Sequence, residues 1–160
     1  MTVAASVVGV HVNPAGGVPK HAVAAAELRR DGVVGDLQRD GEHHGGPERA
    51  VCLFAQERID ALVAEGHPIA PGTTGENLTL AGLEWSTLAA GDRLAVGDEV
   101  VLEVSGPAPP CTTIAASFLD GGFTRISHKL HPGWSRLYAR VLVPGRVHVG
   151  AAVRRLDPRG

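Results

Sequence analysis

One of the two cysteines in this chain, Cys111, ends the segment GPAPPC (residues 106–111) and precedes the apolar run TTIAASF. Proline fixes the backbone φ angle, so the three prolines limit how far the sulfur can move. If the run that follows is helical, Cys111 lies at its N-terminus, where free backbone N–H groups favour a thiolate. These features indicate a thiolate nucleophile or a soft-metal ligand. The structural alternative is a small buried residue in a turn.

A second group of candidate residues lies in GEHHGGPERAV, residues 41–51. His44 directly follows another histidine, and adjacent side chains of a strand point to opposite faces, so the pair would not chelate one ion together. Gly45 and Gly46 allow a ligand to approach the backbone closely. Arg49 is suited to bind a phosphate or a carboxylate. A polar surface loop explains the same residues without any ligand.

Two glycine-containing segments place polar side chains beside predicted strands. GTTGENLTL (72–80) presents Glu76 and Asn77 before a strand, and GVVGD (32–36) presents Asp36. Carboxylate and amide groups in these positions would orient a polar ligand. Turn chemistry alone also accounts for glycine, asparagine and aspartate here.

The segment RISHKLHPGWSRLY, residues 125–138, concentrates basic and aromatic side chains, namely Arg125, His128, Lys129, His131 and Trp134. In a helix, the two histidines would share one face because they are three residues apart. A zinc site with Cys111 is conceivable, but the spacing matches no standard zinc pattern. The pattern favours a cationic wall that binds an anion, and a solvated polar loop is the alternative.

Short strands are expected to position these residues. Valine-rich runs predict strands within 2–12, 50–54, 77–80, 92–106 and 138–150, with hairpin connections at AVGDEV and VPGRV. Cys52, flanked by apolar residues in AVCLF, is expected to be a packed core thiol.

Helices are expected to be few and short. The clearest is QERIDALVAEG (56–66), where Ile59, Leu62 and Val63 share a helical face and Gly66 provides the stop. CTTIAASFL (111–119) predicts a short second helix, and HAVAAAELRR (21–30) is ambiguous between helix and strand.

The element count predicts one mainly β domain, residues 1–160, with two or three short flanking helices. Closure into a barrel is the natural way to remove exposed sheet edges. Regular strand–helix alternation is missing, as are the glycine-rich phosphate-binding motifs of dinucleotide and P-loop folds.

Composition narrows the functional classes. The net charge of −2 and the isoelectric point near 6.4 argue against a nucleic-acid-binding protein. Two cysteines cannot ligate an ordinary iron–sulfur cluster. No apolar run is long enough to span a membrane, and the N-terminus lacks a secretory pattern, so we expect no membrane partner and a cytoplasmic protein with reduced thiols.

Taken together and in order, the motifs resemble the MOSC domain, named after the C-terminal domain of molybdenum cofactor sulfurase. The resemblance covers about Val3 to Leu156 and rests on GVVGD, HHGGPERAVCLF (43–54), PGTTGENLTLAGL (71–83), the run 91–111 and HPGWSRLYARVLVPG (131–145). It is similar to the stand-alone bacterial branch, close to proteins that detoxify N-hydroxylated bases. The resemblance implies a β-rich, barrel-like fold.

The resemblance also implies a molybdenum cofactor, a pterin whose dithiolene sulfurs hold the metal, with a protein cysteine as a further ligand. Cys111 matches that cysteine, and thiolate is a soft ligand suited to such a site. Other positions fall on family motifs that line the cofactor pocket, namely Asp36, His44, Gly45, Gly46, Glu76 and Asn77. Charge suggests three candidates for binding the pterin phosphate, namely Arg49, Arg125 and Lys129.

The activity that the resemblance implies is reduction of N-hydroxylated compounds, such as N-hydroxylated purines or amidoximes. His44 or Asp36 would deliver protons. Because the sequence has no iron–sulfur ligand set and no flavin or nicotinamide motif, we expect a separate electron-donating reductase as a partner.

Two alternatives remain open. In the first, the protein carries sulfur or the cofactor without turnover of its own, and Cys111 holds a persulfide. In the second, the domain has lost the cofactor or binds zinc adventitiously. Pyridoxal phosphate has been linked with the family, but only Lys20 and Lys129 are available for a Schiff base and no motif supports it, so it is not expected.

Overall fold

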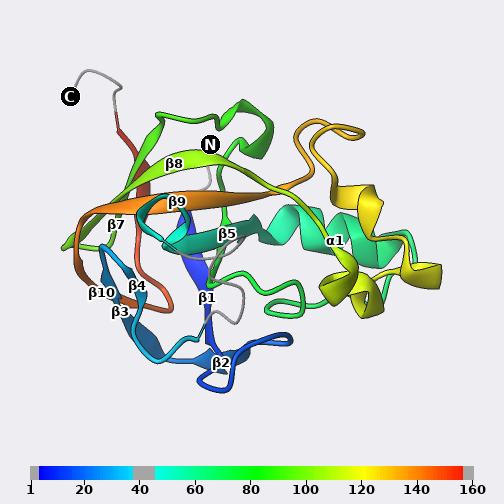
Figure 1. Ribbon diagram of the computed structural model, residues 1–160. Helices are drawn as coiled ribbons and strands as arrows, with labels where there is room; N and C mark the ends of the chain where they lie inside the picture. The colour runs from blue at the N-terminus through cyan, green and yellow to red at the C-terminus, as the bar shows by residue number, and fades with distance from the viewer. Residues whose placement is uncertain (1–3, 38–45, 157–160) are drawn as a thin grey trace.

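The computed structural model describes residues 4–37 and 46–156 of the 160-residue chain (Figure 1). Its strands are β1 (Ser6–Val12), β2 (His21–Val23), β3 (Ala25–Arg29), β4 (Gly32–Val33), β5 (Val51–Ala55), β6 (Leu78–Ala81), β7 (Arg93–Val96), β8 (Val100–Ala108), β9 (Arg136–Val143), β10 (Gly145–His148) and β11 (Val153–Arg155). The helical elements are α1 (Gln56–Ala64) and the 3₁₀ helices η1 (Pro47–Arg49), η2 (Trp85–Thr87), η3 (Thr112–Ser117), η4 (Leu119–Gly121) and η5 (Phe123–Ile126). The predicted mainly β class with few short helices is confirmed.

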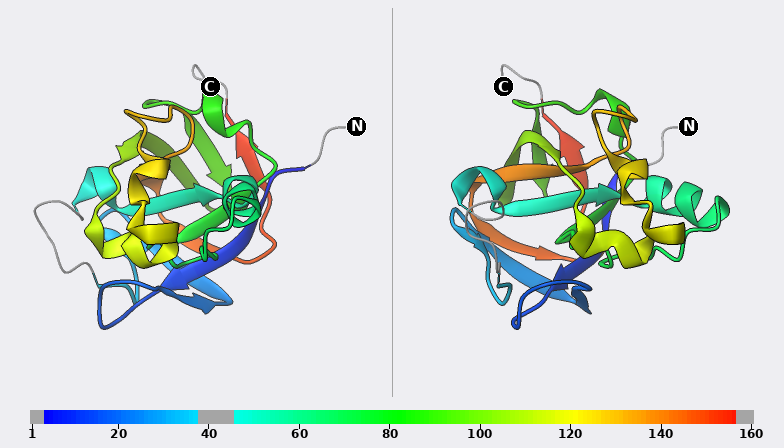
Figure 2. Two further views of the ribbon diagram at one scale, coloured as in Figure 1. Left: turned by 90° about the vertical axis from the view of Figure 1, so that its right-hand side faces the viewer. Right: turned by 45° about the vertical axis from the view of Figure 1, so that its right-hand side comes forward.

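The strands form two sheets. The larger has eight strands in the order β11-β7-β8-β9-β5-β6-β1-β2, and the smaller has three in the order β10-β3-β4. Every pair is antiparallel except β5–β6, which is parallel because α1 makes the crossover between them. The smaller sheet lies at one side of the molecule, while α1 and the short helices η3–η5 gather at the other (Figures 1 and 2).

The large sheet is not closed into a barrel, so the closure expected from the sequence is wrong. The start of β1 meets the segment around β11 at the bridge Ser6–Ala152, where the Val7 amide donates to the Ala151 carbonyl at 2.9 Å. The reason lies in β1, whose free edge is taken by β2 over Val10–Val12. Only the first residues of β1 remain for the segment before β11.

The helix α1 begins at Gln56 and ends before Gly66 as predicted, but one residue of its predicted apolar face is exposed. Ile59 and Leu62 are buried, whereas Val63 is 51% exposed, so its predicted place on the apolar face is wrong. Gly66, with φ of 99°, follows the helix end and adopts the left-handed conformation that glycine tolerates.

Several local predictions are settled by strand pairing. The ambiguous segment 21–30 forms β2 and β3, because β1 and β10 provide partners for it. The predicted hairpin at AVGDEV is confirmed as the β7–β8 connection. The hairpin predicted at VPGRV is wrong, because β9 pairs with β5 and β8 whereas β10 pairs with β3 in the other sheet.

The helix predicted after Cys111 is present as the 3₁₀ helix η3. Residues 128–130 form a turn, so His128 and His131 do not share a helical face. Across the described ranges 4–37 and 46–156, none of the helices has the length and hydropathy needed to cross a bilayer.

Candidate functional site

The candidate site is built on one face of the large sheet, where β5, β9 and β8 are neighbours. Cys52 of β5 is paired with Tyr138 of β9, and both pack against Ala108 at the end of β8. Cys52 is 6% exposed and makes no disulfide. Burial raises the pKa of its thiol to about 11, against the opposing effect of the Arg136 charge. The prediction that Cys52 is a packed core thiol is confirmed.

Cys111 differs from Cys52 because it is partly exposed and lies outside the sheet. It stands directly before η3 with extended backbone angles, φ −144° and ψ 176°. Its Sγ atom lies 2.7 Å from the hydroxyl oxygen of Thr113. Cys111 is therefore the thiol of this chain that a ligand or metal can reach.

Tyr138, the one tyrosine of the chain, lies close to both cysteines. The pKa of Tyr138 is raised to about 12, chiefly by burial and also by the charges of Cys52 and Cys111, while the charges of Arg136 and Arg49 act in the opposite direction. The Arg49 guanidinium lies over the tyrosine ring, 5.6 Å from its centre. Arg49 of η1 thus lies against Tyr138 of β9, the residue whose pKa both cysteines influence.

Asp36 is held in a buried ion pair with Lys20. The Lys20 Nζ lies 2.5 Å from the Asp36 carboxylate, and the two side chains are 9% and 3% exposed. The same carboxylate accepts hydrogen bonds from the Asn13 backbone amide at 2.8 Å and from Asn77 Nδ2 at 3.0 Å. These contacts favour a role of Asp36 in shaping the site, since both of its oxygens already have partners.

Asn77 ties this ion pair to the sheet. Its side-chain oxygen accepts the Cys52 amide at 3.0 Å, and its Nδ2 also donates to the His11 carbonyl at 3.3 Å. The prediction placed Asp36 and Asn77 in one site, and the structure brings them into direct contact.

Glu76 is fully buried beside a chain of hydroxyl groups. Thr74 and Thr79 donate to its two carboxylate oxygens at 2.9 and 3.1 Å, and His11 Nε2 lies 3.1 Å from the Thr79 hydroxyl. Burial lowers the pKa of His11, although the Glu76 charge opposes this effect. Because the Thr79 proton goes to Glu76, His11 Nε2 carries the hydrogen of its bond to Thr79.

The His11 ring leaves its Nδ1 buried and, within residues 4–37 and 46–156, without a hydrogen-bond partner. Gly72 packs tightly at this point, since a Cβ atom there would lie 3.0 Å from Nδ1 and 2.7 Å from the Lys20 carbonyl oxygen. Glycine is needed at position 72 for this close approach and for its φ of 86°.

Arg136, which the sequence reasoning did not select, joins two of the predicted motifs. Its Nη1 donates to the Thr74 carbonyl at 2.7 Å and its Nη2 to the Pro109 carbonyl at 3.1 Å. The residue is 4% exposed, and its Nε has no hydrogen-bond partner among the described residues. A buried guanidinium thus connects the loop before Glu76 with the proline segment before Cys111.

Arg125 and Lys129 are not part of the buried hydrogen-bonded cluster of the described residues. Arg125 makes two hydrogen bonds to Glu65, at 2.9 and 2.8 Å, and lies 4.0 Å above the Trp134 ring, which Arg58 also contacts. These hydrogen bonds lower the pKa of Glu65. Lys129 is exposed in the turn 128–130. Trp134 therefore stacks between arginines and only partly packs on the core.

The remaining predicted residues lie at the limit of the described chain. His44 and Gly45 are outside the described residues. Gly46 directly precedes η1 and has φ of 83°, which suits glycine. Within the residues that are described, no three histidine, cysteine or acidic side chains are placed to share a metal ion, which gives the conceivable zinc site no support.

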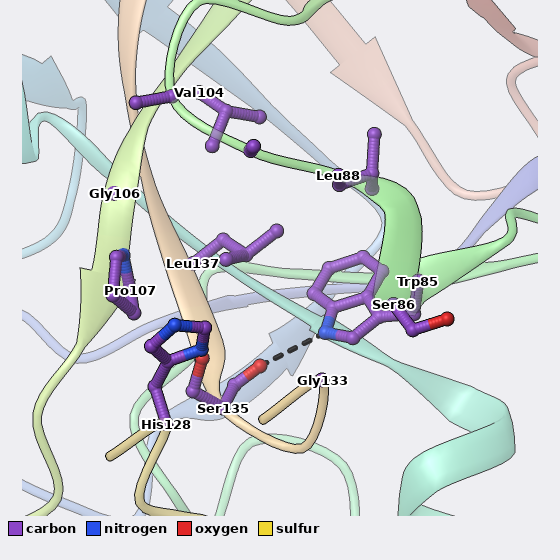
Figure 3. Close-up of a pocket in the computed structure, with 12 residues that line it drawn as sticks. Trp85, Ser86, Leu88, Val104, Gly106, Pro107, His128, Gly133, Ser135 and Leu137 are labelled. Atoms are coloured by element: carbon purple, nitrogen blue, oxygen red, sulfur yellow. Dashed lines mark hydrogen bonds between the residues drawn. The ribbon is translucent and has the colours of Figure 1, made fainter.

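A small pocket lies on the opposite face of the same strands (Figure 3). Leu137, next to Tyr138 on β9, points into it together with Trp85, Leu88 and His128, and its volume is about 110 Å³. The Trp85 Nε1 donates to the Ser135 carbonyl at 2.8 Å, so its polar atom is already satisfied. This pocket is separate from the face that carries Cys52 and Tyr138.

The residues that sequence reasoning missed are His11, Lys20, Arg136 and Tyr138 as members of the site. A two-residue alternation on β9 was the available signal, since it places Arg136 and Tyr138 on one face. Lys20 offered no periodic signal, because it lies at the end of a loop and reaches Asp36 from 16 positions away.

Comparison with known proteins supports the resemblance found in the motifs. The sequence profile described as the MOSC domain matches residues 40–154. YflK of Bacillus subtilis strain 168 is 36% identical over 137 residues, covering 85% of this chain and 61% of YflK. A protein named "Reductase" from Gibberella moniliformis is 31% identical over 131 residues, covering 79% of this chain and 23% of that protein.

YiiM of Escherichia coli is similar in both sequence and structure. It is 32% identical over 126 residues, covering 75% of this chain and 54% of YiiM. A crystal structure of YiiM from Escherichia coli matches with a TM-score of 0.71 and 25% identity, covering 97% of this chain and 70% of that chain. The chain thus spans less than two thirds of the length of each of the three sequence relatives.

Proposed function

Because this chain belongs to the MOSC domain family, we propose that it binds a molybdenum cofactor through Cys111 and reduces N-hydroxylated compounds. The observation that carries the proposal is the contrast between its two thiols. Cys111 is partly exposed at the end of a proline-held segment, whereas Cys52 is buried. The domain therefore offers one accessible soft ligand beside a buried polar cluster.

The residues present fit the chemistry of such a cofactor. Its pterin phosphate is anionic, and the buried Arg136 has no carboxylate in hydrogen-bond or ion-pair contact among the described residues. Arg49 lies over Tyr138 on the same side. When bound, the cofactor supplies a metal centre that passes two electrons to the substrate.

The roles of the protein residues follow from their contacts. Cys111 would ligate the metal, and the Thr113 hydroxyl at 2.7 Å would hold the sulfur in one orientation. Asp36, Lys20 and Asn77 form a buried, fully bonded wall. Glu76 braces the loop through Thr74 and Thr79. We further propose that Gly46 admits the cofactor close to the backbone and that His44 supplies protons.

The proposed reaction needs an external electron donor. Reduction of an N-hydroxyl group to an amine consumes two electrons and two protons, breaks the N–O bond and releases water. We propose that the electrons come from a separate reductase protein, because the chain has no flavin, nicotinamide or iron–sulfur motif of its own. A protein named "Reductase" among the relatives supports the redox class and leaves the substrate open.

The proposal is tested with protein made in a host with increased cofactor synthesis. We expect the purified protein to reduce an N-hydroxylated purine when reduced methyl viologen is supplied and to turn over poorly with NADPH alone. Rapid turnover with NADPH alone would contradict the need for a partner. A persulfide on Cys111 without substrate reduction would instead favour the sulfur-carrier alternative.

A further inference from the structure

Arg136 stands where β8 leaves the sheet. It is the first residue of β9 and pairs with Ala108, the last residue of β8. Beyond Ala108 the chain continues as Pro109 and Pro110, and proline has no N–H to extend the ladder. The Pro109 carbonyl is taken up by Arg136 Nη2 at 3.1 Å, two residues before Cys111.

The other end of the guanidinium holds a different loop. Arg136 Nη1 donates to the carbonyl of Thr74, a residue that is 1% exposed. The Thr74 hydroxyl donates in turn to Glu76. One side chain therefore connects the segment that carries Cys111 with the loop that carries Glu76. Arg136 lies 27 positions from Pro109 and 62 positions from Thr74 in the sequence.

The charge of Arg136 is unusual because nothing in direct contact neutralises it. Within residues 4–37 and 46–156, both of its hydrogen bonds go to neutral carbonyls, its Nε is unpaired and the side chain is buried. Glu76 is linked to it only through Thr74. A buried cation without a paired carboxylate is costly, so its retention needs a reason beyond filling space.

We propose that Arg136 is the positioning residue of Cys111, which fixes the proline segment against the loop 72–77 and keeps a positive charge beside the thiol site. The inference rests on the proposed function only in taking Cys111 as the metal ligand. Arg136 is assigned no contact with substrate. The effects of its two hydrogen bonds and of its charge can be tested separately, because a lysine at position 136 retains the charge but cannot reproduce the planar pair of donors.

The first test is amide hydrogen exchange in the protein without cofactor, followed by NMR. The Ile114 amide donates to the Cys111 carbonyl and the Gly75 amide to the Gly72 carbonyl, so these two amides report on the two connected segments. In Arg136→Met we expect both to exchange at least about tenfold faster, with little change in β3 and β10. In Arg136→Lys the acceleration should be smaller.

The matched control is Arg140→Met, on the same strand. Arg140 is 40% exposed and pairs with Glu48 and Glu103 at the surface. We expect its replacement to leave exchange at Ile114 and Gly75 unchanged. If Arg136→Met fails to fold, Arg136→Lys compared with Arg140→Lys provides the same comparison.

The second test measures molybdenum per chain and the Mo(V) electron paramagnetic resonance spectrum after expression with increased cofactor synthesis. Arg136→Met should lower the metal content severalfold and alter the spectrum, and Arg136→Lys should restore part of both. Unchanged exchange at Ile114 and Gly75, or equal acceleration throughout the sheet, would overturn the positioning role. Absence of molybdenum in the unmodified protein would contradict the proposed function, and the exchange result would still decide the role of Arg136.

Discussion

Two regions that the sequence marked for ligand binding differ in how their charges are satisfied. In the first, Asp36, Lys20 and Asn77 are buried and bonded to one another across 16 and 41 residues of sequence. In the second, Arg125 lies on the Trp134 ring and pairs with Glu65, which is 40% exposed. The first region is buried and its members are bonded to one another, whereas the charges of the second are neutralised by neighbours at the surface.

The difference teaches that a cluster of charges in a sequence is a poor guide to an anion site. The basic segment 125–131 has the higher local density of cations, yet Arg125 is already engaged by a carboxylate. Arg136, at the start of the largely apolar strand β9, is a buried cation without a paired carboxylate in the described chain. Burial and the lack of a carboxylate partner, rather than charge density, single out Arg136.

The largest expected difference between the regions is in stability. Replacing Asp36 by Asn leaves Lys20 buried without its counter-ion, and the expected loss is about 3–5 kcal/mol in the free energy of unfolding. Replacing Glu65 by Gln breaks an ion pair at the surface, where the loss should be at most about 1 kcal/mol. Urea denaturation of both variants measures the difference, and equal losses would remove the distinction between the regions.

Thiol labelling compares buried Cys52, whose amide donates to Asn77 of the first region, with the partly exposed Cys111. With the pKa of Cys52 at about 11, about one thiolate in a thousand is present at pH 8, and burial limits access further. We expect iodoacetamide to modify Cys111 at least about 100-fold faster than Cys52 in the folded protein. Mass spectrometry of peptides follows both sites, with Cys111→Ala as the control. Rapid labelling of Cys52 in the folded protein would show that this face is open.

Buried His11, whose carbonyl accepts a hydrogen bond from Asn77 of the first region, predicts that the free energy of unfolding depends on pH. Because burial lowers the pKa of His11 below its usual value near 6.5, the unfolded chain binds a proton that the folded state resists. The free energy of unfolding therefore has its full contribution from His11 above pH 6.5. Below pH 6.5 this contribution decreases as the pH falls, by at most about 1.4 kcal/mol per pH unit.

The variant His11→Gln isolates this contribution, since the glutamine amide can donate to Thr79 in place of Nε2. Between pH 7 and pH 5 its free energy of unfolding should fall less steeply than that of the unmodified protein. Identical slopes would show that another group is responsible.

The smallest effect is expected in the second region. Arg125→Gln removes the pairing with Glu65 and the contact with Trp134 without touching the first region. We expect molybdenum content to stay within about twofold of the unmodified protein. A large loss of metal would restore Arg125 as a phosphate-binding residue, as its charge first suggested.

The sequence predicted much of the fold because local patterns specify strands. Alternation and valine content located β1, β5, β6, β7 and β8, and the α1 helix was evident from its spacing. The VPGRV connection was misjudged because β9 and β10 join different sheets, which only long-range pairing determines. The prediction of barrel closure was wrong for the same reason, since β2 pairs with part of the free edge of β1.

For the site, the sequence selected Asp36, Glu76 and Asn77, which lie in loops next to strands or at a loop end. It did not select Lys20 or the strand residues His11, Arg136 and Tyr138. The side chains of Asp36, Glu76 and Asn77 are all buried; Asn77 donates to Asp36, and Glu76 accepts from Thr74 and Thr79. Lys20 and His11 reach the cluster through the folding of β1 onto β6 and of the 13–20 loop onto the loop at Gly72. Such contacts between distant segments leave no periodic signal in the sequence.

The central claim is that Cys111, and not Cys52, is the metal ligand of this domain. The most direct measurement is molybdenum content by mass spectrometry, in protein made with increased cofactor synthesis, for the unmodified chain, Cys111→Ala and Cys52→Ala. We predict close to one molybdenum per chain in the unmodified protein and in Cys52→Ala, and at least a tenfold loss in Cys111→Ala. Equal molybdenum in Cys111→Ala and the unmodified protein would contradict the assignment.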